Sequence, residues 1–191
     1  MTTAATPSPL TIALPPWVPS LVAGRTHFAS DDDRMALAIA LSRENVARGT
    51  GGPFGAAVFD DATGELLAVG TNSVRRLGNC VLHAEVMALM FAVQTAGSHA
   101  FDRASPPAIM LATSCDPCAM CLGAVLWSGV RRVVCGATRD DAMTIGFDEG
   151  PVFPASLQYL ADRGVAFTHG VQREAARAVL QDFVAAGNPV Y

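Results

Sequence analysis

The chain has 191 residues, a hydrophobic fraction of 51% and a charged fraction of 16%. These values favour one globular domain with a buried core and exclude an intrinsically disordered chain. The formal net charge of −4 gives no electrostatic support to binding a polyanion such as DNA or tRNA, so we expect a small uncharged substrate and no nucleic-acid partner.

Residues 1–29 are predicted to be an irregular N-terminal arm, and residues 30–191 to be a single domain. The first twenty residues contain five prolines and no basic stretch, which is not the pattern of a signal peptide. No apolar run is long enough to cross a bilayer. An odd count of five cysteines, two of them in a Cys-x-x-Cys pair, favours a reducing compartment, so we expect a cytoplasmic protein.

The apolar periodicity predicts alternating helices and strands. Helical spacing follows Asp31-Asp32-Asp33, which is expected to cap a helix that Gly49 closes. Residues 54–59 and 65–72 flank a turn and predict an antiparallel hairpin. The other expected elements are helices at 83–95, 118–127, 157–162 and 172–186, and strands at 108–113, 131–137 and 165–169. Strands joined through helices are expected to be parallel, as in α/β proteins.

One histidine, one glutamate and two cysteines stand at His83, Glu85, Cys118 and Cys121, with Pro117 before the first cysteine. This His-x-Glu and Pro-Cys-x-x-Cys pattern is recognised as the signature of zinc nucleobase deaminases. Imidazole nitrogen and thiolate sulfur are zinc ligands, and a catalytic site keeps its fourth position open for water. The sequence therefore predicts a catalytic zinc site with His83, Cys118 and Cys121 as ligands.

The spacing also suits the chemistry of such a site. His83 and Cys118 fall at the predicted starts of two helices, whose N-termini create a positive potential that lowers thiol pKa values. Cys118 and Cys121 are three residues apart and share one helical face. Zinc lowers the pKa of a bound water molecule to near neutral pH. Glu85 is predicted to accept a proton from this water and to deliver protons to the ring nitrogen and the leaving amine.

A closed structural zinc site is the alternative, with Cys115 as the nearest candidate for a fourth ligand. We expect Cys115 instead to lie at a strand end, before Pro117 turns the chain. A zinc-stabilised scaffold module without turnover is the corresponding non-enzyme hypothesis. Other reactive or basic residues are predicted to be structural: Cys80 and Cys135 as small apolar residues, and Arg75-Arg76 and Arg131-Arg132 as solvated strand ends.

The stretch 31–139 resembles the cytidine and deoxycytidylate deaminase superfamily. The resemblance is carried by residues 51–56, 71–72, 83–85, 117–121 and 123–127. The C-terminal part, through residues 145–151, is most similar to bacterial guanine deaminases. Asp116 departs from the pattern, since relatives often carry glutamate there.

The resemblance implies a three-layer cytidine-deaminase-like α/β fold, with a five-stranded mixed sheet flanked by helices. It also implies a zinc cofactor, hydrolysis of guanine to xanthine and ammonia, and a homodimer in which the C-terminal segment completes the partner's active site. Deamination of guanosine, of an aminotriazine such as ammeline, or of adenosine in tRNA are the alternative reactions.

The same resemblance implies which residues bind the base. Asn72 is expected to hydrogen-bond it, although a turn asparagine is the plain alternative. Glu149 is expected to accept from the N1–H and the exocyclic amine of guanine, with Asp148 and Asp141 as competitors. The other candidates are Phe54 and Trp127 as stacking walls or plain core, Ala84 beside the ligand histidine, and Tyr191 as a residue that reaches a partner's pocket.

Overall fold

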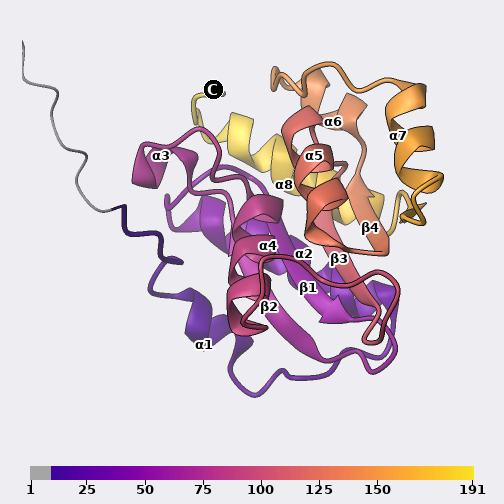
Figure 1. Cartoon of the computed structure of the whole chain (residues 1–191). Helices are drawn as coiled ribbons and strands as arrows, with labels where there is room; N and C mark the ends of the chain where they lie inside the picture. The colour runs from indigo at the N-terminus through magenta and orange to yellow at the C-terminus, as the bar shows by residue number, and fades with distance from the viewer. Residues whose placement is uncertain (1–9) are drawn as a thin grey trace, which may run out of the picture.

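The computed structural model describes residues 10–191, and its strands form one five-stranded sheet in the order β2-β1-β3-β4-β5 (Figure 1). Strand β1 pairs antiparallel with β2 and β3, whereas β3, β4 and β5 are parallel. The predicted five-stranded mixed sheet is therefore confirmed. The strands are β1 Gly55–Asp60, β2 Leu66–Thr71, β3 Ile109–Cys115, β4 Arg132–Ala137 and β5 Ala166–Thr168.

Two hydrophobic clusters lie on the two faces of this sheet. Side chains alternate along β1, so that Ala57 and Phe59 join one cluster while Ala56 and Val58 join the other. The first cluster is covered by α2 Asp31–Ala47 and α8 Arg173–Ala185. The second is covered by α4 Ala84–Thr95, α5 Ala119–Ser128 and α7 Pro154–Ala161. The chain thus forms the three layers that were predicted, with helices on both faces (Figure 1).

Helix α4 lies directly against β2, without a side chain between them at Gly70. A Cβ atom at that position would lie 2.1 Å from the carbonyl oxygen of Ala84 and 2.4 Å from the amide nitrogen of Ala88. Both are backbone atoms of α4, so no rotamer change could relieve the clash. Glycine at this one position sets how closely the helix approaches the sheet.

Three short helices were not predicted: α1 Val18–Val22, α3 Val74–Leu77 and α6 Arg139–Thr144. They are too short to show helical periodicity in the sequence. Helix α1 lies in the segment that was predicted to be irregular, and that part of the prediction is wrong because a proline at its first turn starts a helix there. The part of the arm at residues 1–9 lies outside the described residues.

Helix α2 begins one residue earlier than its cluster of acids suggested. Its N-cap is Ser30, whose hydroxyl accepts a hydrogen bond from the Asp33 amide at 3.1 Å. The acids Asp31, Asp32 and Asp33 instead occupy the first turn, where negative charge is favourable. No helix of the described residues is long and apolar enough to cross a membrane.

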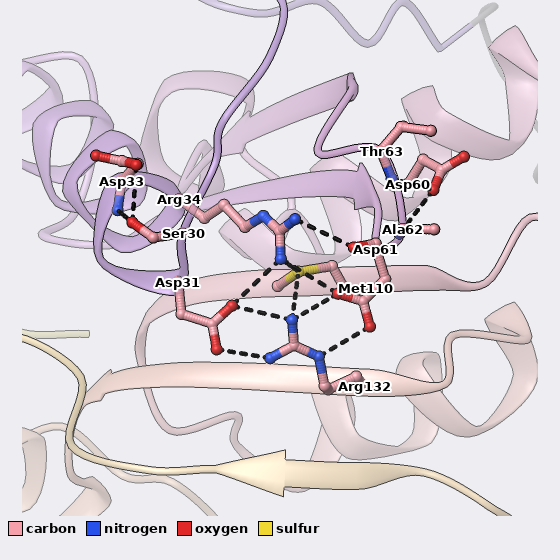
Figure 2. A network of polar contacts seen from close by, with 10 residues as sticks. All are labelled: Ser30, Asp31, Asp33, Arg34, Asp60, Asp61, Ala62, Thr63, Met110 and Arg132. Atoms are coloured by element: carbon pink, nitrogen blue, oxygen red, sulfur yellow. Dashed lines mark hydrogen bonds and ion pairs between the residues drawn. The ribbon is translucent and has the colours of Figure 1, made fainter.

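An ion-pair network ties the start of α2 to the end of β1 and the start of β4 (Figure 2). Arg132 contacts Asp31 at 2.7 Å and the Asp61 carboxylate through Nε at 2.9 Å. Arg34, only 6% exposed, contacts Asp31 and Asp61 at 3.2 Å each. Arg132 is therefore not the solvated strand end that was predicted, because two carboxylates hold its guanidinium group.

We expect Asp61→Asn to lower the free energy of unfolding by about 1–3 kcal/mol at neutral pH, because it leaves two guanidinium groups with one carboxylate. The hydrogen bond from Arg132 holds the pKa of Asp61 below its ordinary value of 3.8. The contribution of Asp61 to the free energy of unfolding is therefore complete above pH 3.8. It is lost as the pH falls through the lower pKa that Asp61 has in the folded protein. Urea denaturation of both proteins checks this: the difference should shrink at about pH 2, and a constant difference would contradict the assignment.

Candidate functional site

The two sequence motifs meet where α4 and α5 begin. His83 is the N-cap residue of α4, and Cys118 is the N-cap residue of α5. Both residues were predicted to stand at the starts of helices. Pro117 follows the end of β3 by two residues and turns the chain toward α5. Both helices therefore direct their N-termini, with their positive potential, at one point.

His83, Cys118 and Cys121 each bring a ligand atom to that point, and these atoms lie within 4.8 Å of one another. The His83 Nδ1 atom lies 3.6 Å from the Cys118 Sγ atom. One imidazole and two thiols form a donor set that zinc accepts in catalytic sites. The side chains present therefore fit the metal that the sequence predicts.

Cys115 does not join this group. It is the last residue of β3, as expected, and its Sγ atom lies 3.5 Å from the carbonyl oxygen of Thr138. The group of three donors around His83 does not include it. The geometry thus leaves the fourth coordination position free of a protein thiol, which favours a catalytic site over a closed structural one.

The contacts among the two thiols and the imidazole shift their pKa values, and the low pKa of one thiol suits metal binding. The hydrogen bond from the Cys121 thiol, followed by that with His83, lowers the pKa of Cys118 to about 4. The same contact between the cysteines, together with burial, raises the pKa of Cys121. Burial alone would lower the pKa of His83, but the Cys118 contact and the nearby Glu85 and Glu149 carboxylates raise it.

Glu85 is a buried carboxylate, 6% exposed, in the first turn of α4, two residues after the histidine. Its Oε1 atom accepts a hydrogen bond from the Thr113 hydroxyl at 3.2 Å, and its Oε2 atom lies 3.5 Å from the Cys121 thiol. Burial, followed by the charge of Cys118, raises its pKa. A carboxyl group whose proton is held more tightly than usual is suited to general acid and base work.

These groups open into a cavity of about 90 Å³. The ring of Phe147 packs edge-on against Phe54 at 4.9 Å and against Tyr191 at 5.7 Å between centroids. The residues that line the cavity are Phe54, Asn72, His83, Glu85, Asp116, Cys118, Phe147, Asp148, Glu149 and Tyr191. The aromatic wall, the thiol cluster and the carboxylates therefore surround one space.

Asn72 and Tyr191 meet in the wall of this cavity. The Tyr191 hydroxyl donates to Asn72 Oδ1 at 2.5 Å, and burial raises the pKa of Tyr191 to about 12. Asn45 Nδ2 donates to the backbone carbonyl of Asn72 at 2.9 Å. In this chain, the C-terminal segment lies in its own cavity, whereas the resemblance implied that it reaches a partner's.

Among the three candidate acids, the structure separates Glu149 from the others. Glu149 is 7% exposed in the cavity wall, and burial, followed by the charge of Cys118, raises its pKa to about 8. Asp148 also lines the cavity, but its Oδ1 atom accepts from the Gly150 amide at 2.9 Å. Asp141 lies outside the cavity and forms an ion pair with Arg173 at 2.9 Å.

Two predicted base contacts are not in the cavity of this chain. Trp127 is 79% exposed and lines a different hollow, together with Leu126 and Tyr159. It falls at the exposed end of α5, so it is neither a wall of this cavity nor core. Ala84 is fully buried behind His83 and is not among the lining residues.

The sequence patterns did not predict three features of the site: Phe147 in the cavity wall, the contact of Thr113 with Glu85, and the contacts of Asp116. The Asp116 carboxylate contacts His169 Nδ1 at 2.7 Å and accepts from the Arg139 amide at 3.2 Å, which holds the turn before Cys118. Phe147 stands inside the segment that resembled guanine deaminases, so a signal existed. Thr113 and His169 carry no local signal, because only the fold brings them to the site.

A larger cavity of about 390 Å³ lies between α5 and α7. Its lining includes Leu122, Leu126, Pro151 and Leu160, and it contains no carboxylate, imidazole or thiol. Because it lacks groups that carry chemistry, the smaller cavity beside the thiols is the better candidate for an active site.

Known proteins resemble this chain over more than half of its length. Residues 29–137 match the family described as the cytidine and deoxycytidylate deaminase zinc-binding region. The guanine deaminase of Bacillus subtilis is 35% identical over 130 residues, which cover 68% of this chain and 79% of that protein. The stretch that the family model matches, residues 29–137, includes both motifs, from His83 to Cys121.

Solved structures share the fold over nearly the whole chain. The guanine deaminase from Nitrosomonas europaea is 40% identical with a TM-score of 0.88, covering 95% of this chain and 100% of that one. A structure in complex with 2,6-diaminopurine is 41% identical with a TM-score of 0.89, covering 96% of each chain. Variants of that protein have been solved in complex with 8-azaguanine, with an asparagine or a glutamate replaced.

Proposed function

The chain belongs to the cytidine and deoxycytidylate deaminase family, and we propose that it is a zinc-dependent hydrolase that converts guanine to xanthine and ammonia. The observation that carries the substrate assignment is the position of Glu149. This buried acid and the buried Glu85 both face the cavity beside the thiol cluster. Relatives 40–41% identical are guanine deaminase or bind purine-type bases, which supports the same substrate.

We assign the metal to His83, Cys118 and Cys121. A zinc ion supplies Lewis acidity and makes water a competent nucleophile near neutral pH. Glu85 accepts one proton of the attacking water and gives it to the ring nitrogen, and it then carries the remaining hydroxyl proton to the leaving amine, so that each proton it gives is one it has received. Thr113 holds the Glu85 carboxylate in place through the hydrogen bond at Oε1.

The remaining cavity residues hold the base. The raised pKa of Glu149 belongs to the metal-free site, and the positive charge of a metal ion held beside it favours the ionised carboxylate. In that form Glu149 accepts from the N1–H and the exocyclic amine of guanine, whereas adenine offers no N1–H. Asn72 Oδ1 already accepts from the Tyr191 hydroxyl, so Asn72 donates to the purine edge through its Nδ2 atom. Phe54 and Phe147 provide apolar ring faces for stacking. Tyr191 covers the base from the side of Asn72.

A substrate panel tests this function. Ammonia release is measured for zinc-loaded protein with guanine, guanosine, ammeline, cytosine and adenosine. We expect rapid release from guanine, with xanthine as the product, and little from cytosine or adenosine. Guanosine or ammeline as the preferred substrate would replace guanine while leaving the deaminase class intact, and no release from any compound would reject the class.

We expect Glu149→Gln to lower kcat/KM for guanine by about 10–1,000-fold, because a charge-assisted pair of hydrogen bonds is lost and an amide donor faces the donor edge of the base. Zinc content, measured by mass spectrometry of the metal, should stay at that of the wild type. Asp141→Asn is the matched control, since Asp141 lies outside the cavity. Unchanged guanine kinetics in Glu149→Gln would move the role to Asp148.

We further propose that the protein is a cytoplasmic homodimer. Aromatic side chains are exposed on α5 and at α7, with Trp127 at 79%, Phe153 at 61% and Tyr159 at 47%. Clustered exposed aromatic residues are typical of protein interfaces. All five cysteines are free thiols, as expected in a reducing compartment.

A further inference from the structure

A second polar pocket, of about 320 Å³, is lined by residues of α3 and by residues at the end of α8. Both helices are labelled in Figure 1. The pocket is lined by residues 49–51, Arg75, Arg76, Phe183 and Asn188, and we call it the arginine pocket. Arg75 and Arg76 were predicted to be solvated strand ends. They instead form part of α3 and face a hollow with no acidic side chain in its lining.

Among residues 10–191, no carboxylate pairs with the arginines of this pocket. The Arg76 Nη2 atom donates to the Ser73 hydroxyl at 3.0 Å and to the Ala13 carbonyl. Its Nε atom is buried and has no hydrogen-bond partner among those residues. Because the two arginines line a hollow that contains no carboxylate, the pocket is suited to an acceptor that carries negative charge.

The pocket shares a wall with the candidate active site. The Thr50 hydroxyl donates to Asn45 Oδ1 at 2.7 Å, and Asn45 Nδ2 donates to the backbone carbonyls of Gly52 and Asn72 at 2.9 Å each. The contact is tight, because a Cβ atom on Gly51 would lie 1.9 Å from the Asn72 carbonyl oxygen. Residues 49–51 therefore pack against the backbone that carries Asn72. A ligand bound against residues 49–51 would contact the segment that positions the Asn72 side chain.

We propose that the arginine pocket binds a phosphate-type anion, as free phosphate or as the phosphate of a small phosphomonoester, and that the bound anion alters guanine binding through residues 49–51 and Asn45. Arginine pairs with phosphate through parallel charge-assisted hydrogen bonds. The volume exceeds that of a phosphate group alone, which leaves room for a sugar beside Phe183 and Asn188. The binding half of this proposal is independent of the proposed reaction, whereas the coupling half rests on it.

Calorimetry with inorganic phosphate, ribose 5-phosphate and uncharged ribose tests the binding. We expect heat from the two phosphates and none from ribose, with affinity about tenfold lower in Arg75→Glu and Arg75→Ala. Arg75 is exposed, so both variants should fold. Arg43→Glu is the matched control, an exposed arginine on α2 outside the pocket, and should bind as the wild type does.

Equal binding of the two phosphates would mean that the phosphate group alone is recognised, and tighter ribose 5-phosphate would show that the rest of the pocket takes part. Equal affinity in the Arg75 and Arg43 variants, or no heat from either phosphate, would overturn the site. For the coupling, KM for guanine should change at least about twofold with saturating anion in the wild type and not in Arg75→Glu. An unchanged KM in the wild type would overturn that half.

Discussion

Glu85→Gln is expected to lower kcat for guanine by about 10²–10⁴-fold while the protein binds zinc as before. Glutamine has nearly the shape of glutamate and can still accept the hydrogen bond from Thr113, which lies 3.2 Å from the carboxylate. It cannot accept the proton of the attacking water. The fold and the three metal ligands therefore stay in place, and only the proton transfer is lost.

Steady-state kinetics and zinc content measured on the same sample separate these two effects. Glu174→Gln, an exposed change of the same kind on α8, is the matched control and should have wild-type kinetics. A Glu85→Gln protein that loses its zinc would place the residue in metal binding. A variant that retains more than about a tenth of wild-type kcat would remove it from the proton-transfer step.

Cys121→Ser is expected to abolish stoichiometric zinc binding and reduce guanine turnover to background. Cys121 is fully buried, with its sulfur in the group of three donors, and serine offers a hydroxyl in place of the thiolate that zinc prefers. A ligand that binds only the folded state raises the unfolding midpoint. Added zinc should therefore raise the Tm of the wild type and leave that of Cys121→Ser unchanged.

Cys115→Ser distinguishes the open metal site from a closed one. The Cys115 sulfur contacts the Thr138 carbonyl and not the donor group, so this variant should keep one zinc per chain and respond to zinc as the wild type does. Loss of zinc from Cys115→Ser would mean four protein ligands, and the catalytic assignment would then fail.

The parts of the site that the sequence predicted are those whose functional residues lie close together along the chain. His83 with Glu85, and Cys118 with Cys121, are each separated by no more than three residues, so their spacing on a helix start is readable without the fold. The individual strands followed from the same kind of local pattern, since each is a short apolar run between turn residues, whereas the five-stranded mixed sheet was implied by the family resemblance.

The parts that could not be predicted depend on contacts between distant segments. Arg132 meets Asp31, which is 101 residues away, and Tyr191 meets Asn72 across 119 residues. Trp127 follows the family pattern in sequence, yet its position at the end of α5 leaves it exposed. No local pattern specifies which face of a helix end meets a cavity, because neighbouring elements decide it.

The close approach at Gly70 restricts how the substrate range of this protein can be redesigned. Because backbone touches backbone there, the helix that carries Glu85 has no adjustable layer beneath it and cannot be tilted to admit a bulkier ring. Phe54, Phe147 and Tyr191 all lie outside the regular helices and strands. Libraries aimed at a new nucleobase should therefore vary these three aromatic positions and leave the glycine alone.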